Sequence, residues 1–377
     1  MTRPNAKGWC PGAYHPMMSG DGLVVRVRPV LTRLEQSQVL GICVAAQDFG
    51  SGIIDLTSRA NLQIRGVQKQ NHNALLQRLN SLDLVPDDPA LESRRNFLIS
   101  PFWKKGDLTH RLAQALTARL CEMPKLPPKV GFAIDTGTAP MFLNDSADFR
   151  LERTPSGELL VRADGMTRGH IVAEDEAINA LIEMAHWFNE NRTDTLKRMA
   201  PLTAKKVLPV QWQGTLRAAP ASELTPGMHE LGAVYGAAFG KIEASRLSNL
   251  ISSTGANAMR ITPWRLFIFE GADLTDTTDF ITGVADPLLR VDACPGAPLC
   301  ETATVKTRGL ARELAPFVKR DLHVSGCAKG CARPRRCAVT LVGNAGTFDL
   351  VHDGAPWDEP VQTGMMPGTL KDCIGEN

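Results

Sequence analysis

The stretch LTSRANLQIRG (56–66) has a distant counterpart in ITPWRLFIFEG (261–271), roughly 200 residues further along the chain. Both stretches begin with an apolar residue and a threonine, contain an arginine and close on a glycine. From Ile53 to Ile64, apolar and polar residues alternate, which is typical of one strand with a core face and a hydrogen-bonding face. The sequence therefore predicts an internally duplicated fold.

Each stretch closes a predicted strand–helix–strand unit. Glycines at 50 and 52 end the first helix, and Gly255 ends the second. Two such units are expected to pair across a pseudo-twofold axis and to pool their arginines over one cavity. The predicted elements are a strand at 23–28, a helix at about 34–48 and a strand at 53–64 in the first unit, and a strand at 239–243, a helix at 244–253 and a strand at 258–271 in the second.

The rest of the chain has a mixed α/β pattern. A strand is predicted at 96–100, and helices are predicted at 109–121 and 174–189. The segment 201–209 has two lysines and no helical pattern, so it is a candidate linker between the halves. With 377 residues and 43% apolar content, the chain is long enough for two or more domains or one large duplicated unit.

Four of the nine cysteines form a C-x5-C motif and a C-x3-C motif near the C-terminus. A disulfide framework fits small secreted domains, whereas this chain is long and opens with no apolar leader, so we expect a reducing cytoplasm. Structural zinc usually takes tighter cysteine pairs. Spacings of five and three, with glycine and proline inside the motifs, favour a bulkier iron–sulfur cluster that its loops must wrap around. The four are Cys294, Cys300, Cys327 and Cys331.

Zinc binding and unrelated buried cysteines remain the alternatives at these four positions. Of the other cysteines, Cys43 lies on an apolar helix face and is expected in the core. Cys337 follows two arginines and is a candidate spare ligand, and Cys10 is ambiguous.

The net charge of +2 predicts no nucleic-acid partner, and the apolar runs are too short to cross a membrane. Basic residues cluster in places, but most of these clusters are expected to be solvated surface; the strand of Arg59 is the exception. No nucleotide-binding fingerprint is present, since GAAFGK (236–241) lacks the spacing of a phosphate loop. Redox chemistry in this chain would therefore draw electrons from a partner or from the substrate.

Taken together, the two cysteine motifs, the Arg-x-Arg strand, the LTSR strand and the internal repeat resemble the sulfite and nitrite reductase superfamily. Three further motifs are similar to one branch of it, the precorrin-3B synthase family. The motifs are GWCPG (8–12), MSGDGLVVRVR (18–28) and HVSGCAKGCA (323–332). The resemblance extends over nearly the whole chain.

The resemblance implies an α+β, internally duplicated sulfite/nitrite reductase-like fold, with two ferredoxin-like half-repeats and two larger α/β lobes. The implied units are 1–80 (first half-repeat), 81–205 (first lobe), 206–280 (second half-repeat) and 281–377 (second lobe, carrying the iron–sulfur cluster).

The resemblance also implies a [4Fe–4S] cluster on the four cysteines, and in the reductases the cysteine matching Cys331 bridges to siroheme iron. The reductase anion pocket uses three arginines and two lysines, of which the second lysine is Gly131 here. Losing one cation weakens a pocket for a small oxyanion, whereas arginines suit the carboxylate rim of a tetrapyrrole. A salt bridge to Asp55 is the structural alternative for Arg59. The implied substrate-binding residues are Arg26, Arg59, Arg95 and Lys129.

The branch implies an oxygen-dependent monooxygenase that converts precorrin-3A to precorrin-3B, by C20 hydroxylation and γ-lactone formation, in aerobic cobalamin biosynthesis. It further implies a mononuclear non-haem iron and an external electron donor, a reductase or a ferredoxin. His15 and His323 lie nearest the signature motifs and are candidate iron ligands, although a lone histidine is more often structural; no catalytic residue is assigned. The alternatives are a siroheme-dependent sulfite or nitrite reductase and an iron–sulfur electron carrier or sensor.

Overall fold

Two five-stranded sheets of matching strand order form the middle of the molecule in a computed structural model, which describes residues 9–374. Gly8 of the N-terminal motif lies outside the described residues. The first sheet has the order β1 (Met17–Ser19), β2 (Gly22–Val27), β5 (Leu62–Val67), β4 (Ile53–Leu56) and β14 (Lys241–Glu243). The second has the order β12 (Gly227–His229), β13 (Gly232–Gly236), β16 (Leu266–Glu270), β15 (Ala258–Ile261) and β3 (Arg33–Glu35). This agreement confirms the duplication predicted from the sequence.

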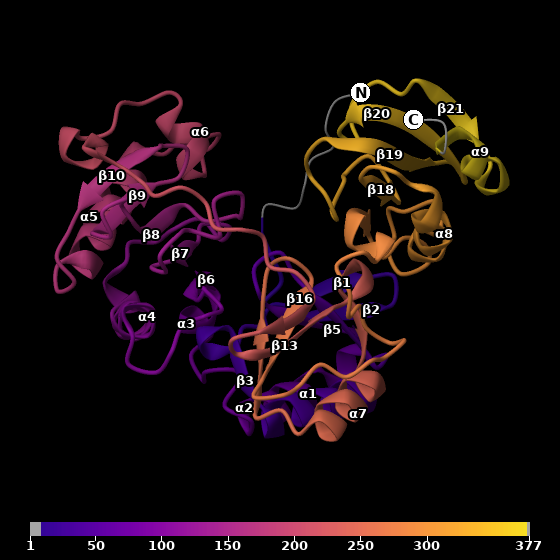
Figure 1. Cartoon of the computed structure of the whole chain (residues 1–377), viewed down its shortest axis with the longest axis horizontal. Helices are drawn as coiled ribbons and strands as arrows, with labels where there is room; N and C mark the ends of the chain where they lie inside the picture. The colour runs from indigo at the N-terminus through magenta and orange to yellow at the C-terminus, as the bar shows by residue number, and fades with distance from the viewer. Residues whose placement is uncertain (1–8, 375–377) are drawn as a thin grey trace.

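The two repeats exchange a strand. β14 comes from the second repeat but pairs with β4 of the first, and β3 comes from the first repeat but pairs with β15 of the second. Each exchanged strand leads directly into a helix, α1 (Gln36–Phe49) or α7 (Ala244–Thr254), and these two helices pack against each other under the sheets (Figure 1). Neither sheet is complete without the other half of the chain.

The first sheet has one apolar and one polar face. Val25, Ile64, Ile54 and Ile242 form a row across four strands and lie in the core cluster with the helices. One residue along, a polar row crosses the same strands on the opposite face, because side chains alternate in a strand. We call this the polar face of the first sheet; its residues include Arg26, Gln63, Asp55 and Lys241 in the paired row, with Asn61 and Arg65 beside it.

The prediction of one strand from Ile53 to Ile64 is wrong. The chain turns between β4 and β5, where Ala60 has a φ of 50° and the Thr57 hydroxyl accepts from the backbone N–H groups of Arg59 and Asn61, at 3.3 and 3.1 Å. The second repeat makes the same turn, with Arg265 at a φ of 62° and the Thr262 hydroxyl accepting from the N–H of Trp264 at 3.4 Å. The threonine shared by the two stretches is thus a turn residue.

The first lobe is built on a six-stranded sheet. Its strands, in spatial order, are β11 (Thr215–Leu216), β10 (Arg168–Ile171), β9 (Leu159–Ala163), β8 (Phe149–Arg153), β7 (Phe132–Ile134) and β6 (Phe97–Ile99). Its helices are α4 (Leu108–Ala118), α5 (Ala177–Asn191) and α6 (Met199–Thr203), and α2 (His72–Asn80) and α3 (Pro89–Arg94) connect it to the first repeat. The linker predicted at 201–209 is wrong, because Leu202 and Leu208 lie in the core of this lobe.

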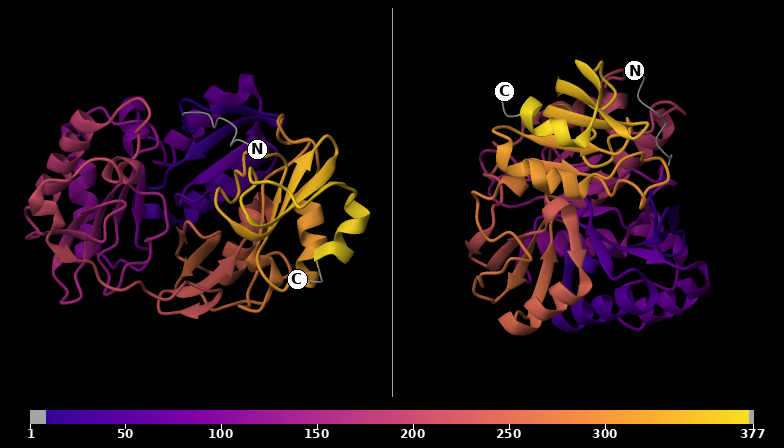
Figure 2. Two further views of the ribbon diagram at one scale, coloured as in Figure 1. Left: turned by 90° about the horizontal axis from the view of Figure 1, so that it is seen from above. Right: turned by 90° about the vertical axis from the view of Figure 1, so that its right-hand side faces the viewer.

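The second lobe carries a five-stranded sheet of β17 (Val291–Ala293), β18 (Leu322–Ser325), β19 (Cys337–Asn344), β20 (Thr347–Gly354) and β21 (Gln362–Met365), in that order. The first three strands are parallel, and α8 (Arg308–Leu314) and α9 (Leu370–Ile374) belong to the same lobe. The two lobes lie on opposite sides of the paired repeats (Figures 1 and 2). Within residues 9–374, no helix has the length and apolar content needed to span a bilayer.

Shortening a side chain of the exchanged strand tests the contribution of the exchange to stability. Ile242 is 1% exposed on β14 and faces Ile54 across the sheet. We expect Ile242→Ala to lower the free energy of unfolding by about 2–5 kcal/mol, because it leaves a cavity between the two halves. Val44→Ala, at a 43% exposed position of α1, is the control and should change it by less than about 0.5 kcal/mol in urea titrations. Equal effects of the two variants would contradict this role of β14.

Candidate functional site

The four cysteines of the two motifs lie together in the second lobe. Cys294 follows β17 and Cys327 follows β18, so both motifs begin at the carboxyl ends of neighbouring parallel strands. The Thr302 hydroxyl lies 3.3 Å from the Cys300 sulfur and 3.8 Å from the Cys327 sulfur. Burial raises the pKa of Cys331, and the charges of the three other thiolates raise it further. The fold therefore brings into one site four cysteines that the sequence separates.

The four cysteines differ in spacing from the ligands of a single metal ion. No three His, Cys, Asp or Glu side chains among those described lie close enough to hold one metal ion. A cubane cluster spreads four thiolates over four irons, so its ligands stand farther apart than those of a single ion. The Gly326 N–H donates to the Cys294 sulfur at 3.1 Å, a contact that favours the thiolate. Four thiols with a backbone donor fit a four-iron cluster.

A cluster of arginines lies where the first repeat meets the first lobe, with Arg26 and Arg28 buried and Arg59 and Arg95 half-buried. The pKa of Arg28 is lowered to about 9, mainly by burial and in part by the charges of the other three. Burial is also the main cause of the lowered pKa of Arg26 and of Arg59. Positive charges that lie close together and away from water disfavour one another's ionised forms. A bound anion would offset this repulsion, so this group of cations is suited to bind an anion.

Arg26 differs from the rest of this group in the number of its buried nitrogens that have no hydrogen-bond partner. Its side chain is 7% exposed, and its Nε and Nη1 atoms have no hydrogen-bond partner among the described residues. The thiol of Cys10 lies near enough to raise the pKa of Arg26 against the larger effect of burial. Arg28, by contrast, is neutralised by a buried ion pair with Glu92. The expectation that most clustered basic residues are solvated surface is wrong for Arg26 and Arg28, whereas Arg65 is buried in the strand that was expected to be the exception.

Arg59 lies at the tip of the β4–β5 hairpin and reaches the first lobe. It donates through Nη2 to the Lys129 carbonyl at 2.7 Å and to the Ser146 hydroxyl at 3.1 Å. The alternative of a salt bridge with Asp55 is wrong, because Asp55 pairs with Arg65 and Arg308 instead. Lys129 is half-buried, and its backbone carbonyl is the group that contacts Arg59.

Gly131 lies directly behind the Arg59 guanidinium. A β-carbon at this position would stand 2.9 Å from the Asn96 carbonyl and 3.5 Å from Nη1 of Arg59. The backbone leaves no room for a lysine side chain here. The local packing therefore fits a glycine at the position where the reductases have the second lysine of their anion pocket.

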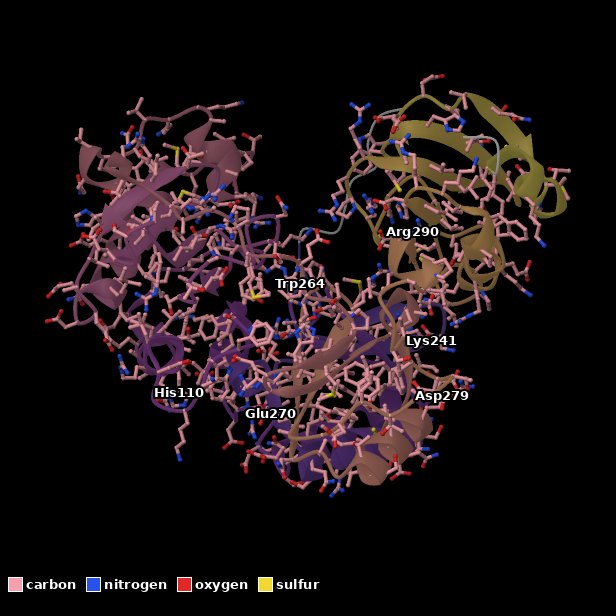
Figure 3. The ribbon with its side chains drawn as sticks, viewed as in Figure 1. His110, Lys241, Trp264, Glu270, Asp279 and Arg290 are labelled. Carbon is pink, nitrogen blue, oxygen red and sulfur yellow. The ribbon has the colours of Figure 1, made fainter. Side chains whose placement is uncertain are left out.

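The second repeat places an aromatic residue where the first has Arg59. Trp264 lies at the tip of the β15–β16 hairpin, near the middle of the molecule (Figure 3). Its indole N–H donates to Asp145 of the first lobe at 3.1 Å, and its ring lies 5.4 Å from that of Phe142. Burial raises the pKa of Asp145, and the charge of Arg335, from the loop after Cys331, opposes this shift. Asp145 of the first lobe is therefore in contact with the hairpin tip of the second repeat, and it senses a charge of the second lobe.

The two histidines are placed differently. His15 is exposed, whereas His323 is fully buried on β18 with neither ring nitrogen hydrogen-bonded within residues 9–374. Burial lowers the pKa of His323 to about 4, so its ring is neutral at pH 7. Its nearest charges are those of Asp292 and Arg333.

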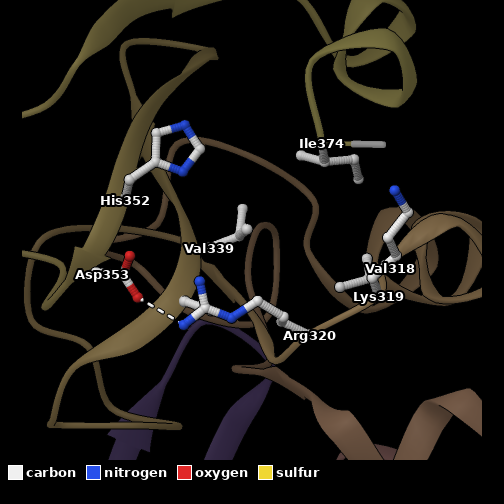
Figure 4. Close-up of a pocket in the computed structure, with 8 residues that line it drawn as sticks. Val318, Lys319, Arg320, Val339, His352, Asp353 and Ile374 are labelled. Carbon is white, nitrogen blue, oxygen red and sulfur yellow. Dashed lines mark hydrogen bonds and ion pairs between the residues drawn. The ribbon is translucent and has the colours of Figure 1, made fainter. Parts of the chain in front are cut away.

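The sequence suggests Cys337 as a spare metal ligand. Cys337 lines a basic hollow of the second lobe with Arg333 and Arg336, and burial raises its pKa to about 11. A neighbouring pocket of about 150 Å³, lined by Val339, His352 and other residues, is too small for a tetrapyrrole (Figure 4).

Comparisons with known proteins agree with this geometry. The family model of a nitrite/sulfite reductase ferredoxin-like half domain matches residues 15–82. A precorrin-3B synthase from Sinorhizobium sp is 31% identical over 383 residues, which cover 93% of this chain and 83% of the relative. The chain belongs to the precorrin-3B synthase family.

The precorrin-3B synthase family shares its fold with the sulfite and nitrite reductase superfamily. The solved structure of the Mycobacterium tuberculosis NirA protein matches 94% of this chain and 79% of its own chain, with a TM-score of 0.66 and 16% identity. At that identity the likeness concerns the fold alone. The predicted α+β, duplicated architecture is confirmed, and membership in the precorrin-3B synthase family makes the chain an enzyme.

The buried histidine predicts a pH dependence of stability. His323 titrates near 6.5 when unfolded but at about 4 when folded, so the unfolded state takes up its proton first as the pH falls. This contribution to stability is present above pH 6.5 and is lost between about 6.5 and 4, with about 2 kcal/mol lost between pH 7 and pH 5. In urea titrations, His323→Gln should flatten the pH dependence by this amount, whereas His186→Gln, at an exposed site, should leave it unchanged. An identical slope in wild type and His323→Gln would refute the assignment.

Proposed function

We propose that this chain is the oxygen-dependent monooxygenase that converts precorrin-3A to precorrin-3B, with C20 hydroxylation and γ-lactone formation, in aerobic cobalamin biosynthesis. Membership in the precorrin-3B synthase family supports the substrate and the pathway. Monooxygenation leaves one atom of O₂ in the product and reduces the other to water. The two electrons that this requires would come from an external donor, a reductase or a ferredoxin.

The observation that carries the proposal is a surplus of buried donors at the polar face of the first sheet and beside it. Besides the ring of His323, four side chains in the described part of the chain have nitrogen atoms with no hydrogen-bond partner, although water cannot reach them. Leaving buried donors unpaired is costly, so a ligand rich in acceptors would be favoured there. A tetrapyrrole with many carboxylates is such a ligand, and guanidinium groups pair with carboxylates in bidentate fashion. The four are Arg26 and Asn61 on this face, Arg28 just after β2, and Arg308 of α8, which pairs with Asp55 on this face.

We assign substrate carboxylate binding to Arg26, Arg59, Arg95 and Lys129. Arg26 would bind from the sheet and Arg59 from the hairpin tip, while Arg95 and Lys129 approach from the connection to the first lobe. Burial lowers the pKa of Arg26, Arg59 and Arg95 alike, and a bound carboxylate would oppose this shift by favouring their charged forms. Their common role would be to hold and orient a large polyanion.

We assign a [4Fe–4S] cluster to Cys294, Cys300, Cys327 and Cys331. When bound, such a cluster supplies single electrons to the reaction. The chain's own part is to supply the thiolates and to hold them, with the Gly326 N–H donating to Cys294. A mononuclear non-haem iron is part of the proposal, but the described side chains present no compact ligand set to assign to it.

The decisive experiment supplies precorrin-3A to the purified protein without oxygen, adds a reductant, and then admits O₂. Formation of precorrin-3B, with the added oxygen atom derived from ¹⁸O₂ by mass spectrometry, supports the proposal. A protein that instead retains a porphyrin-type absorption and reduces sulfite or nitrite is a siroheme-dependent reductase, and the proposal falls.

Replacing Arg59 with alanine tests the carboxylate role. We expect Arg59→Ala to weaken precorrin-3A binding about tenfold or more, since a charge-assisted hydrogen bond is lost, while the iron content stays unchanged. Arg111→Ala, which removes an exposed arginine paired with Glu174, is the matched control and should bind normally. Anaerobic titration followed by absorbance gives the affinity, and an unchanged value for Arg59→Ala would remove this residue from the site.

Replacing Cys327 with alanine tests the cluster assignment. We expect Cys327→Ala to lose the visible absorption of the cluster and most of its bound iron after anaerobic reconstitution, because a cubane needs four ligands. Cys121→Ala removes an exposed cysteine of the first lobe and should reconstitute like wild type. Full iron content in Cys327→Ala would exclude this residue from the ligand set.

A further inference from the structure

The first cysteine loop, 294–300, is held from outside its own lobe. The carbonyl of Leu299, the residue before Cys300, accepts three hydrogen bonds from the first repeat. The donors are the Ser19 hydroxyl at 2.6 Å, the Gly20 N–H at 3.2 Å and Nη2 of Arg65 at 3.3 Å. These partners lie more than 230 positions earlier in the sequence.

Arg65 is itself fixed by two carboxylates. It forms a bidentate pair with Asp21, with Nε and Nη2 at 2.9 and 2.8 Å from the two oxygens, and Nη1 donates to Asp55 at 3.3 Å. Its side chain is 6% exposed. Because this guanidinium is held on two sides and kept from water, its orientation is fixed. In this orientation Nη2 lies 3.3 Å from both the Ser19 hydroxyl and the Leu299 carbonyl.

Asp55 extends this connection back to the second lobe. Its other oxygen accepts from Nη2 of Arg308 at 2.8 Å. Arg308 is the first residue of α8, and the preceding Thr307 donates its hydroxyl to the Cys294 carbonyl. The chain of ion pairs Asp21–Arg65–Asp55–Arg308 therefore links both ends of the cysteine loop to the polar face of the first sheet.

Gly20 shows that the fit is close. A β-carbon on Gly20 would stand 2.3 Å from the Pro298 carbonyl oxygen. This oxygen belongs to the backbone, so it cannot rotate out of the way as a side chain could. Gly20 does not have a positive φ, so an alanine there would not strain its own backbone. The clash with the Pro298 carbonyl would be its only cost. Any residue larger than glycine would have to push the cysteine loop away from the repeat.

The two cysteines of this loop are held by different halves of the chain. The Cys294 sulfur accepts from the Gly326 N–H of its own lobe, whereas the carbonyl next to Cys300 is held by the first repeat. Arg65 and Gln63 are two residues apart on β5, and Gln63 pairs with Arg26. β5 thus pairs with the strand of a substrate arginine at Gln63 and holds the carbonyl beside a cluster ligand at Arg65, two residues (about 7 Å) further along the same strand.

We propose that Arg65 is a positioning residue that, with Gly20, fixes the Cys300 end of the cysteine loop relative to the substrate arginines. The inference rests on the proposed function in one respect, that the cysteines bind a cluster. It identifies the first repeat as part of the cluster-binding site, although it supplies no ligand.

The second repeat offers a matched control. Glu270 occupies the position equivalent to Arg65, one residue before the closing glycine of the repeat. It forms a bidentate pair with Arg33, at 2.8 and 2.9 Å, with no part in the cysteine loop. Arg33→Gln therefore breaks a bidentate pair that is somewhat more exposed, in the same type of sheet. Gly283→Ala adds a β-carbon in open space and is the control for Gly20→Ala.

The test has one readout without a cluster and one with it. In the metal-free full chain, hydrogen exchange is followed for the amides of Ala297 and Cys300, which donate to Val305 and Gly296. We expect about tenfold faster exchange at these amides in Arg65→Gln and in Gly20→Ala, and wild-type exchange in both controls. In the reconstituted proteins, iron release to a chelator should accelerate by a similar factor in the same two variants, with Arg65→Lys intermediate.

Wild-type exchange in both Arg65→Gln and Gly20→Ala overturns the proposal, as does equal acceleration in the controls, which would indicate general destabilisation. The exchange experiment needs no cluster. If wild type binds no iron, the cluster assignment fails, while the exchange data still decide whether Arg65 and Gly20 position the loop.

Discussion

The burial of several guanidinium groups on one face of a sheet is the constraint on which the rest of this structure depends. Arg26, Arg28 and Arg65 are all nearly inaccessible to water. Taking such cations out of water is expensive unless each is paired, and two of them form ion pairs: Arg28 with Glu92, and Arg65 with Asp21 and Asp55. Arg26 stays without hydrogen bonds at two of its nitrogens, which is where an anionic ligand would be stabilised most.

This face can exist because the opposite face of the same sheet is fully apolar. The row from Val25 to Ile242 packs on the helices below, and the strand that ends the row comes from the other repeat. Strand exchange makes one core of the two repeats, so the polar face is presented by a rigid platform. Functional side chains held on such a platform lose little freedom on binding a ligand.

The two lobes add to this platform the contacts of Arg59 and the four cysteines. The first lobe supplies the Lys129 carbonyl and Ser146 to Arg59, and the second supplies the four cysteines. The contact of Leu299 with the first repeat joins the cysteine loop to the platform. Gly131 fits this arrangement, since any side chain there would crowd the Asn96 carbonyl. In the proposed function, the arginines would hold the polyanionic substrate and the cysteines would hold the cluster.

The sequence by itself determined the duplication, the two faces of the first sheet and the four cysteines, because strand alternation and motif spacing are local properties. It did not reveal the turn within 53–64, since Ala60 gives no sign in sequence of its positive φ. Nor could it reveal the strand exchange, the burial of Arg28 or the partners of Asp55. These depend on contacts between residues far apart in the chain, such as Arg308 with Asp55. Only the tertiary structure decided which arginines are paired and which remain free, because that choice depends on which carboxylates the fold brings within reach of each one.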